Sequence, residues 1–195
     1  MSNKMNYIKL ICLVCMAFAS VEGLAQGKIN RPTKKQPQQT TQNRQNQQPV
    51  QSSRLQLTKK YDWVGNYVDG LAIVQQNGKY GFIDKTGKEI IPLKYDEASW
   101  SFQEGLAVVV LNGKWGYVDK TGKEIIPPKY DEVSLHFWEG LAVVVLNGKF
   151  GYVDKTGKEI IPIKYDNAWS FSGGRAKVKL NGEEFYIDKN GVRQK

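Results

Sequence analysis

The sequence predicts an all-β fold built from tandem repeats of about 35 residues. An Asn-Gly pair recurs at intervals of 35, 35 and 34 residues, at Asn77, Asn112, Asn147 and Asn181. The stretches from Gly105 to Pro127 and from Gly140 to Pro162 are identical except that Phe150 replaces Trp115. A fixed period of this size is typical of repeat proteins, in which each unit buries its apolar face against its neighbours.

Each repeat is predicted to form a three-stranded antiparallel meander. The apolar, β-branched run from Leu106 to Leu111 predicts the first strand. The pair Asn112-Gly113 is a strong hairpin signal, and it is followed by a predicted return strand from Lys114 to Asp119. We expect a short third strand from Lys123 to Ile126 that ends at Pro127, because proline has no N–H to donate to a neighbouring strand.

The last copy is expected to end the array. One face of the first strand stays apolar from the second copy to the fourth, whereas the other face becomes Arg175, Lys177 and Lys179 in the last one. A face that turns cationic only in the final copy predicts a capped, open solenoid or curved stack. Residues Arg54 to Asp62 are predicted to form a degenerate extra third strand, which leaves a small four-bladed propeller-like ring as the alternative topology.

Four motifs between Gly105 and Asp131 resemble a known family. They are Gly-Leu-Ala-x-Val, Asn-Gly-Lys-Trp-Gly-Tyr-Val-Asp, Thr-Gly-Lys-Glu-Ile-Ile-Pro and Lys-Tyr-Asp. In these motifs the chain resembles the bacterial WG-repeat, or KWG-repeat, proteins, with about four repeats over residues 53–195. The resemblance implies an exported or surface-associated β-repeat protein and no particular reaction.

Residues 1–25 are predicted to be a signal peptide. Lysines precede an apolar run from Leu10 to Val21 that is too short to span a membrane, and small residues lead to a cleavage site after Ala25. No transmembrane anchor is expected after cleavage. Cys12 and Cys15 both lie in this segment, so the mature chain needs no disulfide. We therefore expect an exported protein that is periplasmic, extracellular or associated with the cell surface.

Residues 26–52 are predicted to be a disordered, basic linker. They contain nine Gln and three Asn among 27 positions. The formal charge of the whole chain is +9, yet residues 61–195 carry 18 basic and 18 acidic side chains. The folded part is therefore neutral, and no nucleic-acid partner is expected. Binding of an anionic polymer through the linker is a weaker alternative function.

The candidate ligand contacts lie in the segments that join one repeat to the next. Aromatic residues that recur at fixed positions are predicted to be core: Tyr67, Phe102, Phe137, Phe171, Tyr61, Tyr95, Tyr130 and Tyr165. The irregular ones are the candidates for contact with a ligand: Trp63, Trp100, Trp138 and Trp169, together with His136. Exposed tryptophans could stack on sugar rings or anchor a peptide, and filling gaps between repeats is the alternative role.

No catalytic residue, metal site or cofactor is predicted. The chain has a single histidine and the mature part has no cysteine, which excludes the usual zinc and nucleophile arrangements. Carboxylates recur once per repeat just before a turn, which is typical of turn capping, at Asp84, Asp119, Asp154 and Asp188. We therefore expect a non-enzymatic binding or scaffold module for a protein or polysaccharide partner in the cell envelope. A small exported carbohydrate-active or hydrolytic enzyme, which would need two converging carboxylates, is the alternative.

Overall fold

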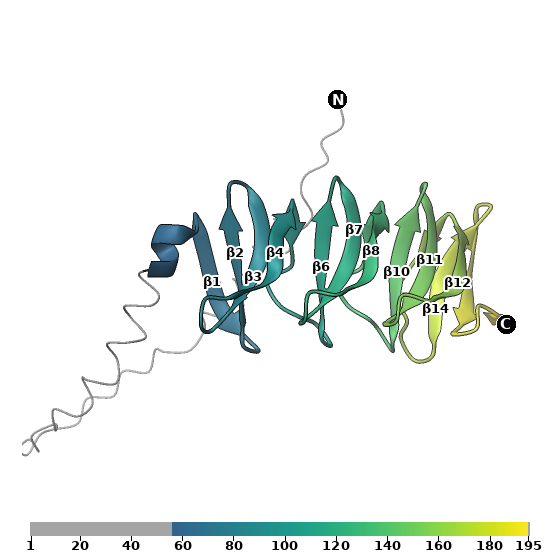
Figure 1. Ribbon diagram of the computed structural model, residues 1–195. Helices are drawn as coiled ribbons and strands as arrows, with labels where there is room; N and C mark the ends of the chain where they lie inside the picture. The colour runs from purple at the N-terminus through teal and green to yellow at the C-terminus, as the bar shows by residue number, and fades with distance from the viewer. Residues whose placement is uncertain (1–55, 195) are drawn as a thin grey trace, which may run out of the picture. The chain divides into compact units, whose positions relative to one another are not determined.

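The computed structural model describes residues 56–194. The predicted signal peptide (1–25) and linker (26–52) lie outside the described residues. The unit that begins at Leu57 contains 16 strands in four antiparallel sheets, which follow one another in chain order (Figure 1). The predicted all-β repeat fold is confirmed.

Each sheet contains four strands that are adjacent in the sequence. The first sheet has β1 (Trp63–Val68), β2 (Leu71–Gln76), β3 (Lys79–Asp84) and β4 (Glu89–Tyr95). The second has β5 (Glu97–Ala98), β6 (Leu106–Leu111), β7 (Lys114–Asp119) and β8 (Glu124–Tyr130). The third has β9 (Glu132–Val133), β10 (Leu141–Leu146), β11 (Lys149–Asp154) and β12 (Glu159–Tyr165). The fourth has β13 (Asn167–Ala168), β14 (Arg175–Leu180), β15 (Glu183–Asp188) and β16 (Arg193–Gln194).

The predicted hairpin of the repeat is confirmed, and the sheet has one strand more than the predicted meander. β6 and β7 have the predicted bounds, with positive φ angles of 53° and 72° at Asn112 and Gly113 in the turn between them. The additional strand is the two-residue β5, which pairs with β6, and β9 and β13 do the same in later sheets. A strand of two residues is too short to show alternation in the sequence.

The predicted end of the third strand was wrong, because β8 continues through Pro127 and Pro128 to Tyr130. In this pairing Trp115 is opposite Tyr130, and Tyr117 is opposite Ile126. An advance of two residues along β7 therefore corresponds to four residues along β8, which forms a β-bulge. The prolines lie in this bulge, on the outermost strand of the sheet. Their missing N–H groups therefore interrupt no regular pairing.

The glycine of each aromatic-Gly pair is required by this bulge. A Cβ atom added to Gly116 would lie 2.3 Å from the carbonyl oxygen of Ile126 and 2.7 Å from the nitrogen of Pro128. At Gly81 and Gly151 an added Cβ would likewise meet the carbonyl oxygens of Ile91 and Ile161, at 2.5 and 2.8 Å. The last sheet has Phe185 at this position, where β16 pairs only with Tyr186 and Ile187. The last sheet can hold a side chain at Phe185 because β16 does not pair with that residue.

Successive sheets share hydrophobic cores, which confirms the open stack. Leu71 and Phe82 of the first sheet pack with Ala107 and Val109 of the second. Equivalent clusters join the second sheet to the third and the third to the fourth. On the far face of the last sheet the cationic prediction is confirmed, because Arg175 is exposed whereas Leu106 and Leu141 at its position are buried.

The last sheet also exposes a tyrosine that is core elsewhere. Tyr186 is 42% exposed, whereas its counterparts Tyr117 and Tyr152 are 1% and 0% exposed. The rings of Tyr117 and Tyr152 each pack at a steep angle against a phenylalanine of the following repeat, with centroids 5.0 Å apart in both pairs. The guanidinium of Arg175 lies 4.6 Å from the centre of the Tyr186 ring and covers it in place of such a phenylalanine.

At the other end, the prediction of an extra strand over Arg54 to Asp62 was wrong for its described part. Residues 56–60 form a helical turn, in which the N–H of Tyr61 donates to the oxygen of Leu57 at 2.9 Å. The side chains of Leu57 and Tyr61 pack against Ala72, Val74 and Ile83 of the first sheet.

The recurring aromatics are buried as predicted, with one exception. Buried members are Phe102, Phe137, Phe171, Tyr61, Tyr95, Tyr130 and Tyr165. The prediction was wrong for Tyr67, which is 37% exposed. Phe102 packs on Phe82 of the preceding sheet, with ring centroids 5.1 Å apart. Tyr67 lies in β1, and its hydroxyl donates to the carbonyl oxygen of Asp84 at 3.1 Å.

Candidate functional site

The candidate residues lie in three link segments, each of which joins a short strand to the next long strand. They comprise residues 99–105, 134–140 and 169–174. Each link segment holds one of the predicted tryptophans, and all three are exposed: Trp100 by 44%, Trp138 by 52% and Trp169 by 41%. Trp63 is in β1 instead and is half-buried. Three of the four predicted tryptophans therefore lie on the surface.

None of the three exposed tryptophans is needed at its position by the repeat. Trp100 corresponds to Leu135, since each directly follows a serine, Ser99 or Ser134, whose N–H donates to the next long strand. Trp138 corresponds to Gln103, since each follows that phenylalanine and pairs with the first residue of the next long strand. The fold thus accepts leucine or glutamine at these two positions.

The third position is identified by backbone hydrogen bonds. The N–H of Trp169 donates to the oxygen of Lys177 at 3.0 Å. Ser99 and Ser134 make the same bond to the equivalent residues of β6 and β10, at 2.8 and 2.9 Å. Two other repeats therefore place serine where the last repeat places tryptophan.

Neighbouring groups hold the tryptophan rings in different ways. Trp100 meets Trp63 edge to face, with ring centroids 4.9 Å apart, and Trp63 packs against the first core cluster. Trp138 meets the exposed ring of His136 at 5.9 Å. The ammonium of Lys177 lies 5.4 Å from the centre of the Trp169 ring. His136 and Trp63 thus lie beside exposed tryptophans.

The backbone of the link segments is fixed by hydrogen bonds. Gln103 and Leu106 exchange two backbone bonds of 2.8 and 3.0 Å, and Trp138 and Leu141 exchange two of 2.9 and 3.1 Å. The hydroxyl of Tyr152 donates to the oxygen of Trp169 at 2.7 Å from the preceding sheet. The tryptophans are therefore presented on a defined backbone.

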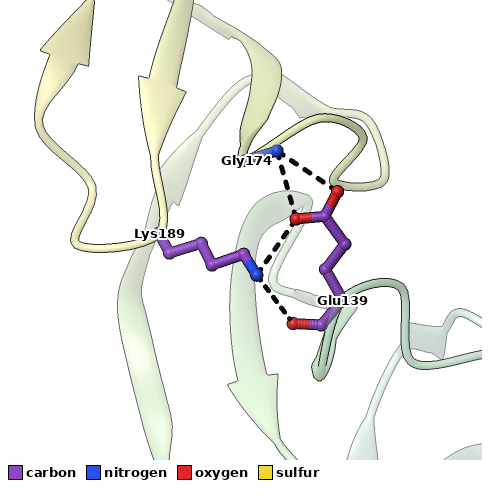
Figure 2. Close-up of polar contacts among 3 residues, drawn as sticks. All are labelled: Glu139, Gly174 and Lys189. Atoms are coloured by element: carbon purple, nitrogen blue, oxygen red, sulfur yellow. Dashed lines mark hydrogen bonds and ion pairs between the residues drawn. The ribbon is translucent and has the colours of Figure 1, made fainter.

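Ion pairs between repeats hold the turn after β1 and the far ends of the first two link segments. The ammonium of Lys120 lies 2.9 Å from a carboxylate oxygen of Asp69, and Lys155 pairs with Glu104 in the same way one repeat later. The third pair joins Lys189 to Glu139 at 3.0 Å, as Figure 2 shows. The Glu139 carboxylate also accepts from the N–H of Gly174, at 3.1 and 3.2 Å to its two oxygens.

These contacts of Glu139 hold the pKa of its carboxyl below the usual range. The bond from Lys189 contributes most, followed by the bond from the backbone N–H of Gly174. The carboxylate is therefore charged at neutral pH and engaged within the protein. The ion pair recurs at three junctions between repeats, so it positions the repeats rather than serving one site.

The remaining recurrent carboxylates cap turns, as predicted. One oxygen of Asp119 accepts from the N–H and hydroxyl of Thr121, at 2.8 and 2.6 Å, and from the N–H of Lys123 at 3.0 Å. These bonds, led by the one from the Thr121 hydroxyl, lower the pKa of Asp119. Asp84 and Asp154 make the same set. Residues 56–194 contain no group of three or more His, Cys, Asp or Glu placed to hold a metal ion.

A comparison with known families identifies the repeat. The model of the WG containing repeat matches residues 57–80, 80–115, 115–150 and 150–183. The chain belongs to the WG-repeat family. No curated protein matches this WG-repeat chain. Over the described residues 56–194, the WG-repeat domain has no helix that is long and apolar enough to cross a membrane.

Two solved structures show a distant similarity to the WG-repeat chain. One is PorZ, an essential bacterial surface component of the type-IX secretion system of Porphyromonas gingivalis, with 8% identity and a TM-score of 0.37. The similarity covers 67% of this chain and 20% of PorZ, so the chain spans a fifth of that structure. The other is from work on the de novo evolutionary emergence of a symmetrical protein, with 12% identity and a TM-score of 0.29 over 66% of this chain and 70% of that one.

Proposed function

We propose that this WG-repeat protein is a non-enzymatic binding or scaffold module that is exported to the cell envelope. In this proposal the link segments hold a protein or glycan partner, with Trp100, Trp138 and Trp169 as the main contacts. One observation carries the proposal. All three tryptophans are 41% to 52% exposed at positions where other copies of the same repeat have leucine, glutamine or serine.

The energetics of aromatic side chains support a binding role. Burying a large apolar side chain contributes about 1.5–3 kcal/mol, and tryptophan is enriched among residues that dominate binding energy. Large rings that the repeat does not require for packing are available for that purpose. Because their backbones are already fixed by hydrogen bonds, little conformational entropy would be lost on binding.

The state of the carboxylates supports a non-enzymatic role. An acid–base pair needs two carboxylates directed at one point, with environments that separate their pKa values. Here Asp119 and its equivalents cap turns, and Asp131 pairs with Lys114 at 2.6 Å while accepting from the N–H of Asn147 at 2.6 Å.

Export is supported by the signal-peptide pattern of residues 1–25.

The experiment replaces each tryptophan with the residue that another repeat has at its position. The variants are Trp100→Leu, Trp138→Gln, Trp169→Ser and the triple combination. Partners retained from a bacterial envelope extract are compared between the wild type and the triple variant, and both are applied to a glycan array. Val192→Ser is the matched control, because Val192 is 58% exposed outside the link segments.

We expect the triple variant to melt within a few degrees of the wild type and to lose its partner, while Val192→Ser keeps it. Unchanged retention by a folded triple variant would overturn the proposal. A large drop in melting temperature for Trp138→Gln alone would show instead that this ring is a packing residue.

A further inference from the structure

We infer that the ligand is a linear, neutral glycan that lies along the series of link segments. The inference rests on the proposed function and adds its ligand class. It follows from three properties of the link segments: the groups beside the rings, the paired state of their backbone, and their spacing along the stack.

Hydroxyl and amide groups lie in the link segments of Trp100 and Trp138, and the ammonium of Lys177 beside Trp169 is paired with Glu184. The hydroxyl of Ser99 donates to the oxygen of Ser101 at 3.0 Å, and the amide of Gln103 donates to the hydroxyl of Ser101 at 3.2 Å. The hydroxyl of Ser134 donates to the oxygen of His136 at 2.8 Å. Hydroxyl and amide groups donate and accept at once, as the hydroxyls of a sugar do.

The charged groups of the link segments are already paired within the protein. Glu104 is bound by Lys155, and Glu139 by Lys189 and the N–H of Gly174. An acidic or basic partner would have to break these pairs between repeats in order to use them. A neutral ligand leaves them intact, and its apolar C–H faces can stack on the exposed rings.

The backbone of the link segments is not available to pair with an extended peptide. Peptides that add to a sheet edge are held by main-chain hydrogen bonds. At the start of β6, the edge is occupied by the bonds that Ser99 and Gln103 make with Val108 and Leu106. The same bonds recur at the starts of β10 and β14. What the surface offers is rings and neutral side chains, which suits a glycan better than a strand.

The spacing of the link segments favours a chain of sugars over a single sugar. Trp100, Trp138 and Trp169 lie in three successive repeats, and each short strand meets the preceding sheet in the same way: β5 contacts β3, β9 contacts β7 and β13 contacts β11. Sheets that pack face to face lie about 10 Å apart. A monosaccharide is too small to reach from one link segment to the next, whereas a linear oligosaccharide can contact several.

The test titrates the full chain with defined sugars and follows tryptophan fluorescence and binding heat. The probes are linear hexasaccharides of glucose and of N-acetylglucosamine in β1,4, β1,3 and α1,4 linkage, and the matching disaccharides. Oligogalacturonate of the same length is the charged comparison. We expect at least one neutral hexasaccharide to bind at least about tenfold more tightly than its disaccharide. Its affinity should change little with salt and exceed that of oligogalacturonate.

The variants separate the ligand class from the proposed function. Trp138→Gln should weaken the hexasaccharide by about tenfold and the triple variant by more, with Val192→Ser unchanged and all melting temperatures retained. The inference is overturned if no neutral hexasaccharide binds, or if hexasaccharide and disaccharide bind equally. If sugars fail while the triple variant still loses its envelope partner, only the ligand class is wrong. If the folded triple variant loses neither, the proposed function fails as well.

Discussion

Substituting Gly116 with alanine tests the close approach of β8 to β7. The added Cβ would lie 2.3 Å from the Ile126 oxygen, 2.7 Å from the Pro128 nitrogen and 2.9 Å from the Pro127 carbonyl carbon. All three are backbone atoms, so no flexible side chain can move aside. Overpacking costs about 1–3 kcal/mol, and we expect the upper end because the pairs at Trp115 and Tyr117 hold β8 in place. For a domain of this size that corresponds to a drop in melting temperature of about 10 °C.

Gly113→Ala is the matched control, measured in the same thermal and urea unfolding experiments. Gly113 has a φ of 72°, and an added Cβ would meet nothing within 4 Å. Its cost is therefore that of placing a side chain in the left-handed region, about 1–2 kcal/mol. The reasoning is refuted if Gly116→Ala destabilises the protein no more than Gly113→Ala does.

Two further predictions concern charge. Glu139→Gln removes the charged partner of Lys189 and keeps an acceptor for the N–H of Gly174. Because salt screens an exposed ion pair, the melting temperature of the variant should fall slightly at low salt and match that of the wild type in concentrated NaCl. An equal loss of melting temperature at both salt concentrations would contradict a screened ion pair. Burial raises the pKa of the Tyr117 and Tyr152 hydroxyls, so they stay neutral in the fold while unfolded tyrosines ionise near pH 10. Their stabilising contribution is thus complete below pH 10 and is lost as the pH rises above it. Because the chain also has exposed tyrosines, only the last part of the tyrosinate absorbance should appear together with the loss of the β circular dichroism signal. Complete ionisation of all tyrosines well before that loss would show that these two rings are accessible.

The repeat architecture was predictable because four copies in one chain show which positions are constant. Leu106 and Lys114 begin their strands as predicted, since alternation and the Asn-Gly turn are local properties. The capped end was visible in Arg175, because only the last copy places a charge on an otherwise apolar face.

The errors arose where neighbouring sheets or strands determine the outcome. Pro127 was expected to end a strand, and the bulge opposite Gly116 lets the strand continue. Residues 56–60 match the end of a third strand in sequence but form a helical turn that packs Leu57 against the first sheet. Tyr67 was expected to be buried, and it is 37% exposed with its hydroxyl bonded to the carbonyl oxygen of Asp84.

The sequence indicated which tryptophans are exposed, but it did not indicate the ion pairs that hold the link segments. The irregular positions of Trp100, Trp138 and Trp169 pointed to exposure, which the structure bears out. The ion pairs that fix the link segments, such as Lys155 with Glu104, join residues 51 positions apart. Such a pairing depends on how consecutive sheets stack, so a recurring lysine and a recurring acid in the sequence do not reveal it.

The ion pairs between repeats make the array tolerant of changes in length. Each lysine meets an acid in the repeat before it, in a register that is the same at all three junctions. Deleting residues 105–139, one whole period, would place Glu104 directly ahead of Gly140 and within reach of Lys189, as it is now within reach of Lys155. Recombination between the nearly identical middle copies could therefore lengthen or shorten the protein by whole units, and with them the number of tryptophans offered to a ligand, while the two end structures stay the same.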